Sequence, residues 1–253
     1  MSAAAAAARR ALPRGWADFG FQVVLWLGFY FSYQAVRSLA DRDSGKAFLN
    51  GLRVIGLEQR ITPHHLFEQT AQSIVDSSQW LLTAAAWTYW NSEFTVIGLT
   101  LLWVYLRRNE QFTRFRNTIL LANTLGLVGY VALPTAPPWM FPSYGFVDGV
   151  NHSHGLLGAL GNPYAAMPSL HAADALVVAV CLFATSRHWW SKALWAFWPA
   201  WVWFCVMATA NHFWLDVLAG IVVAVISLVI VSKTPWLSGR RSAPVEQPIA
   251  NLL

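Results

Sequence analysis

Residues 162–186 read NPYAAMPSLHAADALVVAVCLFATS, which places a serine and a histidine at the start of a long apolar segment. Proline is tolerated in the first turn of a helix and serine is a favoured N-cap, so this pattern predicts a helix over residues 170–186. A second histidine, His212, follows His171 by 41 residues and opens another apolar segment. Two histidines at the mouths of apolar helices call for one common explanation.

The composition is that of a membrane protein. Of 253 residues, 56% are hydrophobic and 11% are charged, whereas soluble domains carry about 25% charged residues. The net charge of +5 would suit nucleic acid if the basic residues formed one face. They lie between the apolar segments instead, so we expect no nucleic-acid partner. Cys181 and Cys205 fall inside apolar segments, and no disulfide framework is indicated.

The apolar segments predict an all-α fold, a polytopic membrane helix bundle with about six transmembrane helices. Since about 20 residues cross a hydrocarbon core of ~30 Å, five of these helices are expected at residues 16–39, 117–133, 170–186, 193–210 and 213–232. Within residues 80–106 we expect one spanning helix that ends at Leu106, preceded by a shallow surface segment. If residues 73–90 crossed the membrane instead, the histidines would lie inside or a seventh helix would be needed.

Three regions divide the chain. Residues 1–15 are expected to form a low-complexity cytoplasmic tail, residues 16–232 one membrane-embedded catalytic domain, and residues 233–253 a disordered cytoplasmic tail rich in proline and arginine. Between helices one and two, apolar residues at positions 48, 52 and 55 have helical spacing among many charges. That pattern predicts an amphipathic helix at the membrane interface.

The basic residues predict the orientation, because cytoplasmic ends of membrane helices are enriched in lysine and arginine. With helix one running outward, the inner side holds 12 of the 17 basic residues: Arg9, Arg10, Arg14, Arg107, Arg108, Arg114, Arg116, Arg187, Lys192, Lys233, Arg240 and Arg241. Both histidine stretches and the proline-rich loop after helix three then meet on the outer face. We therefore predict a multi-pass protein of the cell membrane with its active site on the non-cytoplasmic side.

The residue types at the two helix mouths suit phosphoryl transfer. His212 and Asp216 are four residues apart and so share a helix face, where the carboxylate can orient the imidazole as a nucleophile or merely cap the helix. His171 follows Ser169 in a first helical turn, where backbone N–H groups attract an anion and the imidazole can protonate a leaving oxygen. Asp174 lies on the same face and either orients His171 or makes a buried polar contact.

These residues resemble the type 2 phosphatidic-acid phosphatase superfamily, whose second and third motifs read PSGH and SR-x5-H-x3-D. Residues 168–171 read PSLH, and His212 is followed by Asp216 and Gly220. The resemblance implies that His212 forms a phosphohistidine with Asp216 as its partner. It also implies that His171 protonates the leaving alcohol and later activates water or another acceptor, and that Ser169 binds a phosphoryl oxygen.

The chain departs from that family pattern at its basic residues. Leu170 replaces the glycine of PSGH, Val206 stands where the third-motif arginine belongs, and the first motif is missing from the predicted outer face. The loop at residues 133–139, LPTAPPW, is similar to the branch that contains the inositol phosphorylceramide synthases. Phosphoryl transfer still needs positive charge. The basic residues and histidines expected on the outer side are Arg37, Arg42, Lys46, Arg53, Arg60, His64, His65, His152 and His154. Among these candidates we predict Arg53 and Arg60 as the phosphate ligands.

The sequence thus predicts an integral membrane lipid-phosphate phosphatase or phosphotransferase that works through a phosphohistidine. Its substrate would be a phosphorylated lipid or a prenyl phosphate held among membrane lipids. No HExxH sequence or dense ligand cluster is present, so no metal and no other cofactor are expected. The alternative is a non-catalytic lipid-binding or scaffold protein derived from the same fold. Joint retention of the two histidines with Ser169 and Asp216 argues against that alternative.

Overall fold

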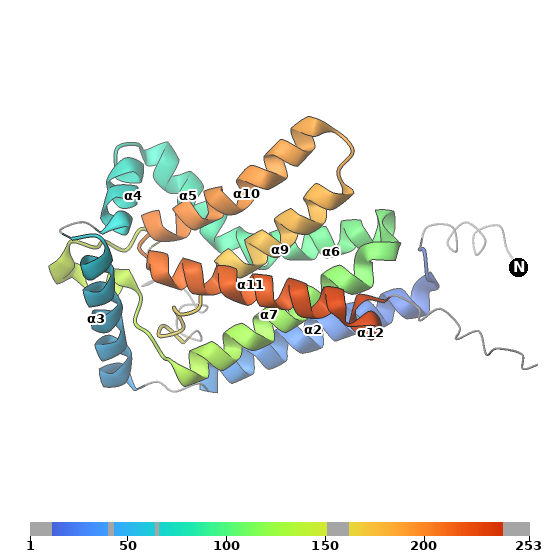
Figure 1. The fold of residues 1–253 in the computed structure, drawn as a ribbon, viewed down its shortest axis with the longest axis horizontal. Helices are drawn as coiled ribbons and strands as arrows, with labels where there is room; N and C mark the ends of the chain where they lie inside the picture. Colours follow the sequence, from blue (N-terminus) through green and yellow to red (C-terminus); the bar gives the residue numbers. More distant parts are fainter. Residues whose placement is uncertain (1–11, 40–42, 64–65, 151–161, 240–253) are drawn as a thin grey trace, which may run out of the picture.

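The chain folds into an elongated helical bundle with a cap of shorter helices at one end (Figure 1). This computed structural model describes residues 12–39, 43–63, 66–150 and 162–239. Across those ranges the regular elements are all helices, and one isolated bridge joins Thr135 to Ala165. The predicted all-α fold class is confirmed.

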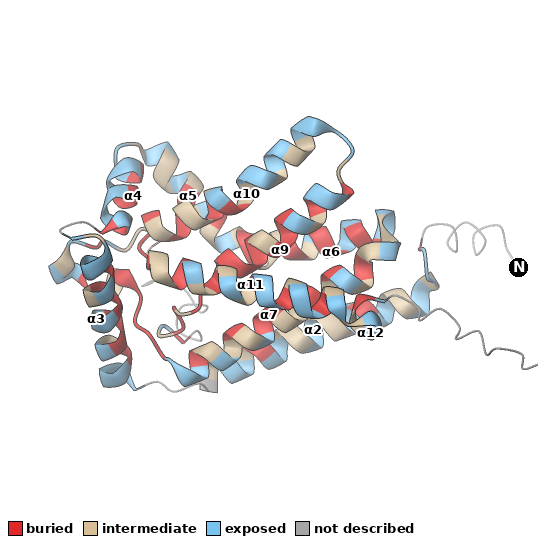
Figure 2. Cartoon of the chain, in the orientation of Figure 1, coloured by how far each residue is buried: buried red, intermediate tan, exposed pale blue. Residues whose placement is uncertain are grey.

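The bundle helices lie close to the predicted segments. They are α2 (Gly15–Leu39), α5 (Gln79–Ser92), α6 (Thr95–Arg107), α7 (Asn109–Ala132), α9 (Leu170–Thr185), α10 (Trp189–Ala208) and α11 (Trp214–Lys233). Helix α9 is central, because it packs against α7, α10 and α11, and most of its residues are buried (Figure 2). The residues at its first turn are therefore shielded on several sides.

Residues 79–107 form two helices that meet at a bend. Helix α5 ends at Ser92, Glu93 and Phe94 form the bend, and α6 continues away from the capped end (Figure 1). In this region we expected one spanning helix preceded by a shallow segment. The structure instead has two consecutive helices joined at a bend, and both belong to the bundle. Residues 73–90 do not form a helix of their own, since α4 (Phe67–Asp76) ends before α5 begins.

The predicted amphipathic helix is two helices, α3 (Ser44–Ile61) and α4. Thr62 precedes Pro63, and a residue before proline is disfavoured in the helical region, so α3 stops there. Asp43 caps the start of α3 by accepting a hydrogen bond from the Lys46 N–H at 3.1 Å. Helix α3 lies across the end of the bundle and covers it (Figure 1).

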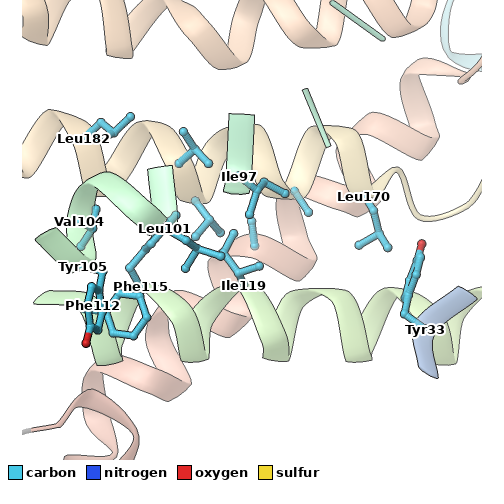
Figure 3. Close-up of a cluster of buried hydrophobic side chains, with 14 of the residues drawn as sticks. Tyr33, Ile97, Leu101, Val104, Tyr105, Phe112, Phe115, Ile119, Leu170 and Leu182 are labelled. Carbon is cyan, nitrogen blue, oxygen red and sulfur yellow. The ribbon is translucent and has the colours of Figure 1, made fainter. Parts of the chain in front are cut away.

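The largest buried cluster fills the bundle between α6, α7 and α9. Ile97, Leu101 and Val104 of α6 meet Phe115 and Ile119 of α7 and the apolar side of α9 (Figure 3). A smaller cluster lies under α3, where Ile55 packs with Phe141 and Phe213. The second cluster connects the cap to the turn that precedes α11.

The predicted C-terminal tail begins with an ordered segment. Helix α12 (Pro235–Ser238) packs against α7 and α11, and the Asn117 side chain donates to the Leu237 carbonyl at 2.7 Å. The prediction of disorder from residue 233 onward is therefore wrong for residues 233–239. Residues 240–253 of that tail, and residues 1–11 of the N-terminal tail, lie outside the described residues.

Apolar side chains cover much of the outside of the bundle. Helix α11 alone exposes Leu218, Val222, Val225, Ile226, Val229 and Ile230. By length and hydropathy, α11 is the one helix in the described ranges that meets a strict criterion for crossing a membrane, and α6 and α9 are apolar but shorter. An apolar exterior of this extent is unusual for a protein surrounded by water.

Candidate active site

The start of α9 is fixed by its own cap and by α11. The Ser169 hydroxyl accepts a hydrogen bond from the Ala172 N–H at 3.3 Å, and the Ser169 N–H donates to the Asp216 carbonyl at 2.9 Å. Helix α11 approaches closely because Gly220 lies against the Ser169 carbonyl, where any Cβ would collide with the backbone. These contacts hold the first turn of α9, and with it His171, next to the first turn of α11.

A tight turn between α10 and α11 presents His212. Ala210 has a φ of 56°, in the left-handed region that non-glycine residues rarely adopt. The N–H groups of Asn211 and His212 both donate to the Val206 carbonyl, at 3.0 and 3.1 Å. At the position where the family pattern has an arginine side chain, this protein uses a backbone carbonyl to hold the turn.

The tautomer of His212 follows from its neighbours. Its Nδ1 lies 2.9 Å from the Ala166 carbonyl, which can only accept, so Nδ1 carries the proton. The Asp216 carboxylate lies 3.6 Å from the same nitrogen and accepts the Phe213 N–H at 2.9 Å. Nε2 is left with its lone pair, which is the form required of a nucleophile.

The two imidazoles are close to each other. The ring centroids of His171 and His212 are 5.6 Å apart, and the His171 ring stacks on Tyr89 at 4.6 Å. The Glu93 carboxylate lies 3.5 Å from Nε2 of His171. Each histidine thus has a carboxylate within 3.6 Å of one of its ring nitrogens. Sequence reasoning missed Glu93, whose signal was its place as the sole charged residue of a long apolar segment.

Both histidines line a cavity of about 300 Å³. Aromatic side chains form much of its wall: Tyr30, Tyr89, Trp90, Tyr130 and Trp139. The polar part of its wall consists of Gln34, Arg37, Glu93, Asn162 and Asn211, beside the two histidines. The predicted meeting of the two histidine stretches with the proline-rich loop is confirmed within one cavity, because Pro137 lines it as well.

Arg37 is the arginine that lines this cavity. The two arginines that the sequence predicted as phosphate ligands lie elsewhere. Arg53 and Arg60 are exposed on α3 and do not line the cavity, and Arg53 donates to the Asn50 side chain at 3.2 Å. The signal for Arg37 was its helical spacing from Tyr30 and Gln34 in an otherwise apolar segment. Arg42, His64, His65, His152 and His154 lie outside the described residues.

Two other predicted residues have structural contacts. Ser169 is fully buried as the cap of α9 and is not among the residues that line the cavity. Both carboxylate oxygens of Asp174 accept from the Asn123 side chain, at 2.9 and 3.1 Å, in the interior of the bundle. Of the two alternatives for Asp174, this geometry matches the buried polar contact.

Two buried glutamates hold the start of α11, and we call Glu58 and Glu68 the carboxylate clamp. Glu58 accepts the Leu215 N–H at 3.1 Å, and Glu68 accepts the Trp214 N–H. Both side chains are fully buried. Burial raises the pKa of Glu58 to about 9, with Glu68 adding to the shift, and burial raises the pKa of Glu68 to about 7. Sequence reasoning missed both, although Glu58 shares a helix face with Val54 and Gly51.

Comparison with known proteins agrees with this geometry. The family model described as PAP2 superfamily matches residues 53–230. The phosphoinositol dihydroceramide synthase of Bacteroides thetaiotaomicron is 30% identical over 140 residues, which cover 48% of this chain and 46% of that protein. The chain thus matches about half of the length of that relative.

A solved structure shows the same fold. The crystal structure of Aquifex aeolicus LpxE superposes with a TM-score of 0.52 at 18% sequence identity, and the match covers 65% of this chain and 93% of that one. The family expected from the PSLH stretch and the His212 stretch is confirmed. Since the family model matches well over half of the sequence, the chain belongs to the PAP2 superfamily, a family of membrane phosphatases and phosphotransferases.

Proposed function

We propose that the protein is a lipid-phosphate phosphatase or phosphotransferase that forms a phosphohistidine at His212, with its cavity open to the non-cytoplasmic side. One observation carries the proposal. Two imidazoles line the same cavity with ring centroids 5.6 Å apart, and each has a carboxylate within 3.6 Å of a ring nitrogen. This pairing suits one nucleophile and one general acid.

In the first step Nε2 of His212 attacks the phosphorus atom of the substrate. The bond between phosphorus and the lipid oxygen breaks, and His171 donates a proton to that oxygen as the alcohol leaves. As Nε2 becomes bonded to phosphorus the ring becomes cationic, and Asp216 at 3.6 Å stabilises that charge. The Glu93 carboxylate lies 3.5 Å from Nε2 of His171, where it can orient that ring.

In the second step His171, now neutral, removes a proton from the acceptor. The acceptor oxygen attacks phosphorus, the bond from phosphorus to Nε2 breaks, and His212 is restored. Water as acceptor gives inorganic phosphate, and a lipid alcohol gives a new phosphorylated lipid. The similarity to a phosphoinositol dihydroceramide synthase favours an alcohol acceptor.

A lipid substrate and a multi-pass position in the membrane fit the surface of the bundle. Leu218, Val222 and Val229 of α11 are exposed on a helix long and apolar enough to cross a membrane. The cavity wall is partly aromatic, which suits the apolar part of a lipid near its head group. The predicted spans and the excess of basic residues on one side support a cavity that opens to the non-cytoplasmic side.

The test uses full-length protein in nanodiscs and lipid phosphates labelled with ³²P. We expect an alkali-stable, acid-labile phosphoenzyme that disappears in His212→Gln, and a rate at least about 100-fold lower in His171→Gln. His188→Gln is the matched control, because His188 lies at the start of α10 and stacks on Trp190 away from the cavity. Chromatography then separates labelled phosphate from a labelled second lipid and so separates the two reaction types.

The non-catalytic alternative makes the opposite prediction. A protein that only binds lipid would retain its lipid-phosphate binding without forming a phosphoenzyme, and His212→Gln would change no turnover. Either result across a panel of lipid and prenyl phosphates would overturn the proposed function.

A further inference from the structure

One face of α2 forms part of the cavity wall. Tyr30, Gln34 and Arg37 line the cavity at intervals of four and three residues, which is the spacing of a single helix face. Arg37 belongs to the last turn of α2, so it lies at the capped end of the bundle with both histidines. This helix precedes residues 53–230, the part of the chain that the family model matches.

Two buried polar atoms on this face have no hydrogen-bond partner among the described residues. Nε of Arg37 and Oε1 of Gln34 are buried and make no hydrogen bond to any part of the chain that the structure describes. A buried charged donor without a partner is costly, so such groups usually bind a ligand or water. For a guanidinium the matching ligand is a planar or tetrahedral oxyanion, which it can bind through two parallel hydrogen bonds.

The positions of the family motifs supply no positive charge for the phosphate of the substrate. Val206 supplies no charge where the family pattern has an arginine, and Arg53 and Arg60 are exposed on α3 and do not line the cavity. Among the described residues that line the cavity, Arg37 carries the only lysine or arginine charge. We infer that Arg37 binds the phosphoryl oxygens of the substrate, so that the first helix provides the charge that the motif positions lack.

This inference rests on the proposed function and adds a phosphate-binding residue to it. The charge that develops on the phosphoryl oxygens during transfer would be stabilised by a guanidinium that is fixed before the substrate arrives. Arg37 has a competing use, because Glu93 lines the same cavity and Arg37 could serve only to balance that carboxylate. The two uses predict different results in a double variant.

The direct test measures binding of orthovanadate, a tetrahedral oxyanion, to full-length protein in nanodiscs. We expect Arg37→Gln to weaken orthovanadate binding at least about 10-fold and to lower kcat/KM at least about 100-fold, with Arg37→Lys recovering part of both. Arg53→Gln is the matched control, since it removes the same side chain from the same end of the molecule outside the cavity. Thermal unfolding shows whether each variant is folded.

The double variant Arg37→Gln with Glu93→Gln separates the two uses. If Arg37 binds phosphate, the double variant stays weak in orthovanadate binding. Recovery of wild-type binding in the double variant would overturn the inference, as would unchanged binding in Arg37→Gln or no binding by the wild type. Phosphoenzyme formation at His212 is measured separately, so the inference can fail while the proposed function stands.

Discussion

The position of His212 depends on two side chains that lie more than 140 residues before it. Glu58 and Glu68 accept the N–H groups of Leu215 and Trp214, and the Asp216 side chain accepts that of Phe213. Three consecutive N–H groups at the start of α11 are thereby satisfied by carboxyl oxygens, although a helix leaves its first N–H groups without partners of its own. The clamp holds the turn that presents His212, the proposed nucleophile.

The carboxylate clamp predicts a pH dependence of stability. Since the pKa of Glu58 rises from 4.5 to about 9, the folded protein keeps a proton that the unfolded chain releases. The free energy of unfolding must then fall as pH rises from 4.5 toward 9, by up to about 1.4 kcal/mol per pH unit for one proton. Glu58→Gln cannot ionise, so we expect a flatter dependence of Tm on pH.

The control for Glu58→Gln is Gln59→Ala, a neighbouring exposed position of α3 that should retain the wild-type dependence. Glu68, whose pKa is raised to about 7, adds a similar slope from 4.5 to about 7 and can be tested with Glu68→Gln. An unchanged slope in Glu58→Gln would mean that the folded protein does not hold this proton.

At this scale, sequence reasoning found the groups that local patterns mark and missed those that only the fold marks. His171, His212 and Asp216 stand at helix mouths with recognisable spacing, and they meet as predicted. Arg37 and Glu93 interrupt apolar segments, and nothing local says which way they face. The burial of Glu58 arises from contact with α11, which is far away in the sequence.

Helix α3 is the element that connects the cap to the site. Its buried face combines small, branched apolar and polar residues, and Asn50 donates to the Pro134 carbonyl at 2.8 Å. At Gly51 a Cβ would approach the Phe141 ring and come within 3.0 Å of the Ala136 carbonyl, so α3 packs directly on the loop after α7. The side chains of Leu49, Leu52, Leu57 and Ile61 remain exposed on the opposite side.

Substitutions in α3 should separate packing from helix propensity. Gly51→Ala would push α3 away from the loop, so we expect a loss of about 1–3 kcal/mol in stability and slower turnover, because Glu58 moves with the helix. Gly56→Ala is the control, since its Cβ would meet nothing within 4 Å and alanine favours a helix. Thermal unfolding and turnover are measured on both, and equal effects would contradict the packing argument.

The helical spacing of residues 48, 52 and 55 predicted α3 correctly. The structure, however, does not bury these residues together on one face. Ile55 is buried whereas Leu52 is 42% exposed. In a helix at a membrane surface, apolar side chains can face either the protein interior or lipid. Hydrophobic periodicity alone does not distinguish these two environments. The bundle helices were predicted more closely, because long apolar segments bounded by charges leave few alternatives.

On the scale of the whole molecule, basic residues are more numerous at one end of the bundle than at the other. The start of α2, the junction of α6 with α7, the junction of α9 with α10 and the end of α11 lie away from the cap (Figure 1). By the helix bounds, the basic residues in or next to these segments are Arg14, Arg107, Arg108, Arg114, Arg116, Arg187, Lys192 and Lys233. Helices α5 and α6 together make one pass away from the cap, and α7 returns to it. The starts of α9 and α11, which carry the two histidine stretches, therefore lie at the same end as α3. Counting charges could therefore predict which segments meet, though not which side chains line the cavity.

Cysteine accessibility tests the orientation in intact cells. In a background with Cys181→Ser and Cys205→Ala, Leu57→Cys on α3 should react with a membrane-impermeant thiol reagent. Trp236→Cys on α12, at the opposite end and also exposed, should react only after the membrane is opened. The reverse pattern would place the cavity on the cytoplasmic side.

Arg37 lies in a helix that precedes the family match, and this has a bearing on how relatives are classified. A score that counts Val206 as a lost arginine would group this chain with pseudoenzymes. An inventory of charge around the cavity would group it with active members, because the guanidinium is supplied from a different part of the chain. Relatives without the motif arginines are thus better classified by whether any helix places a lysine or arginine side chain in the cavity.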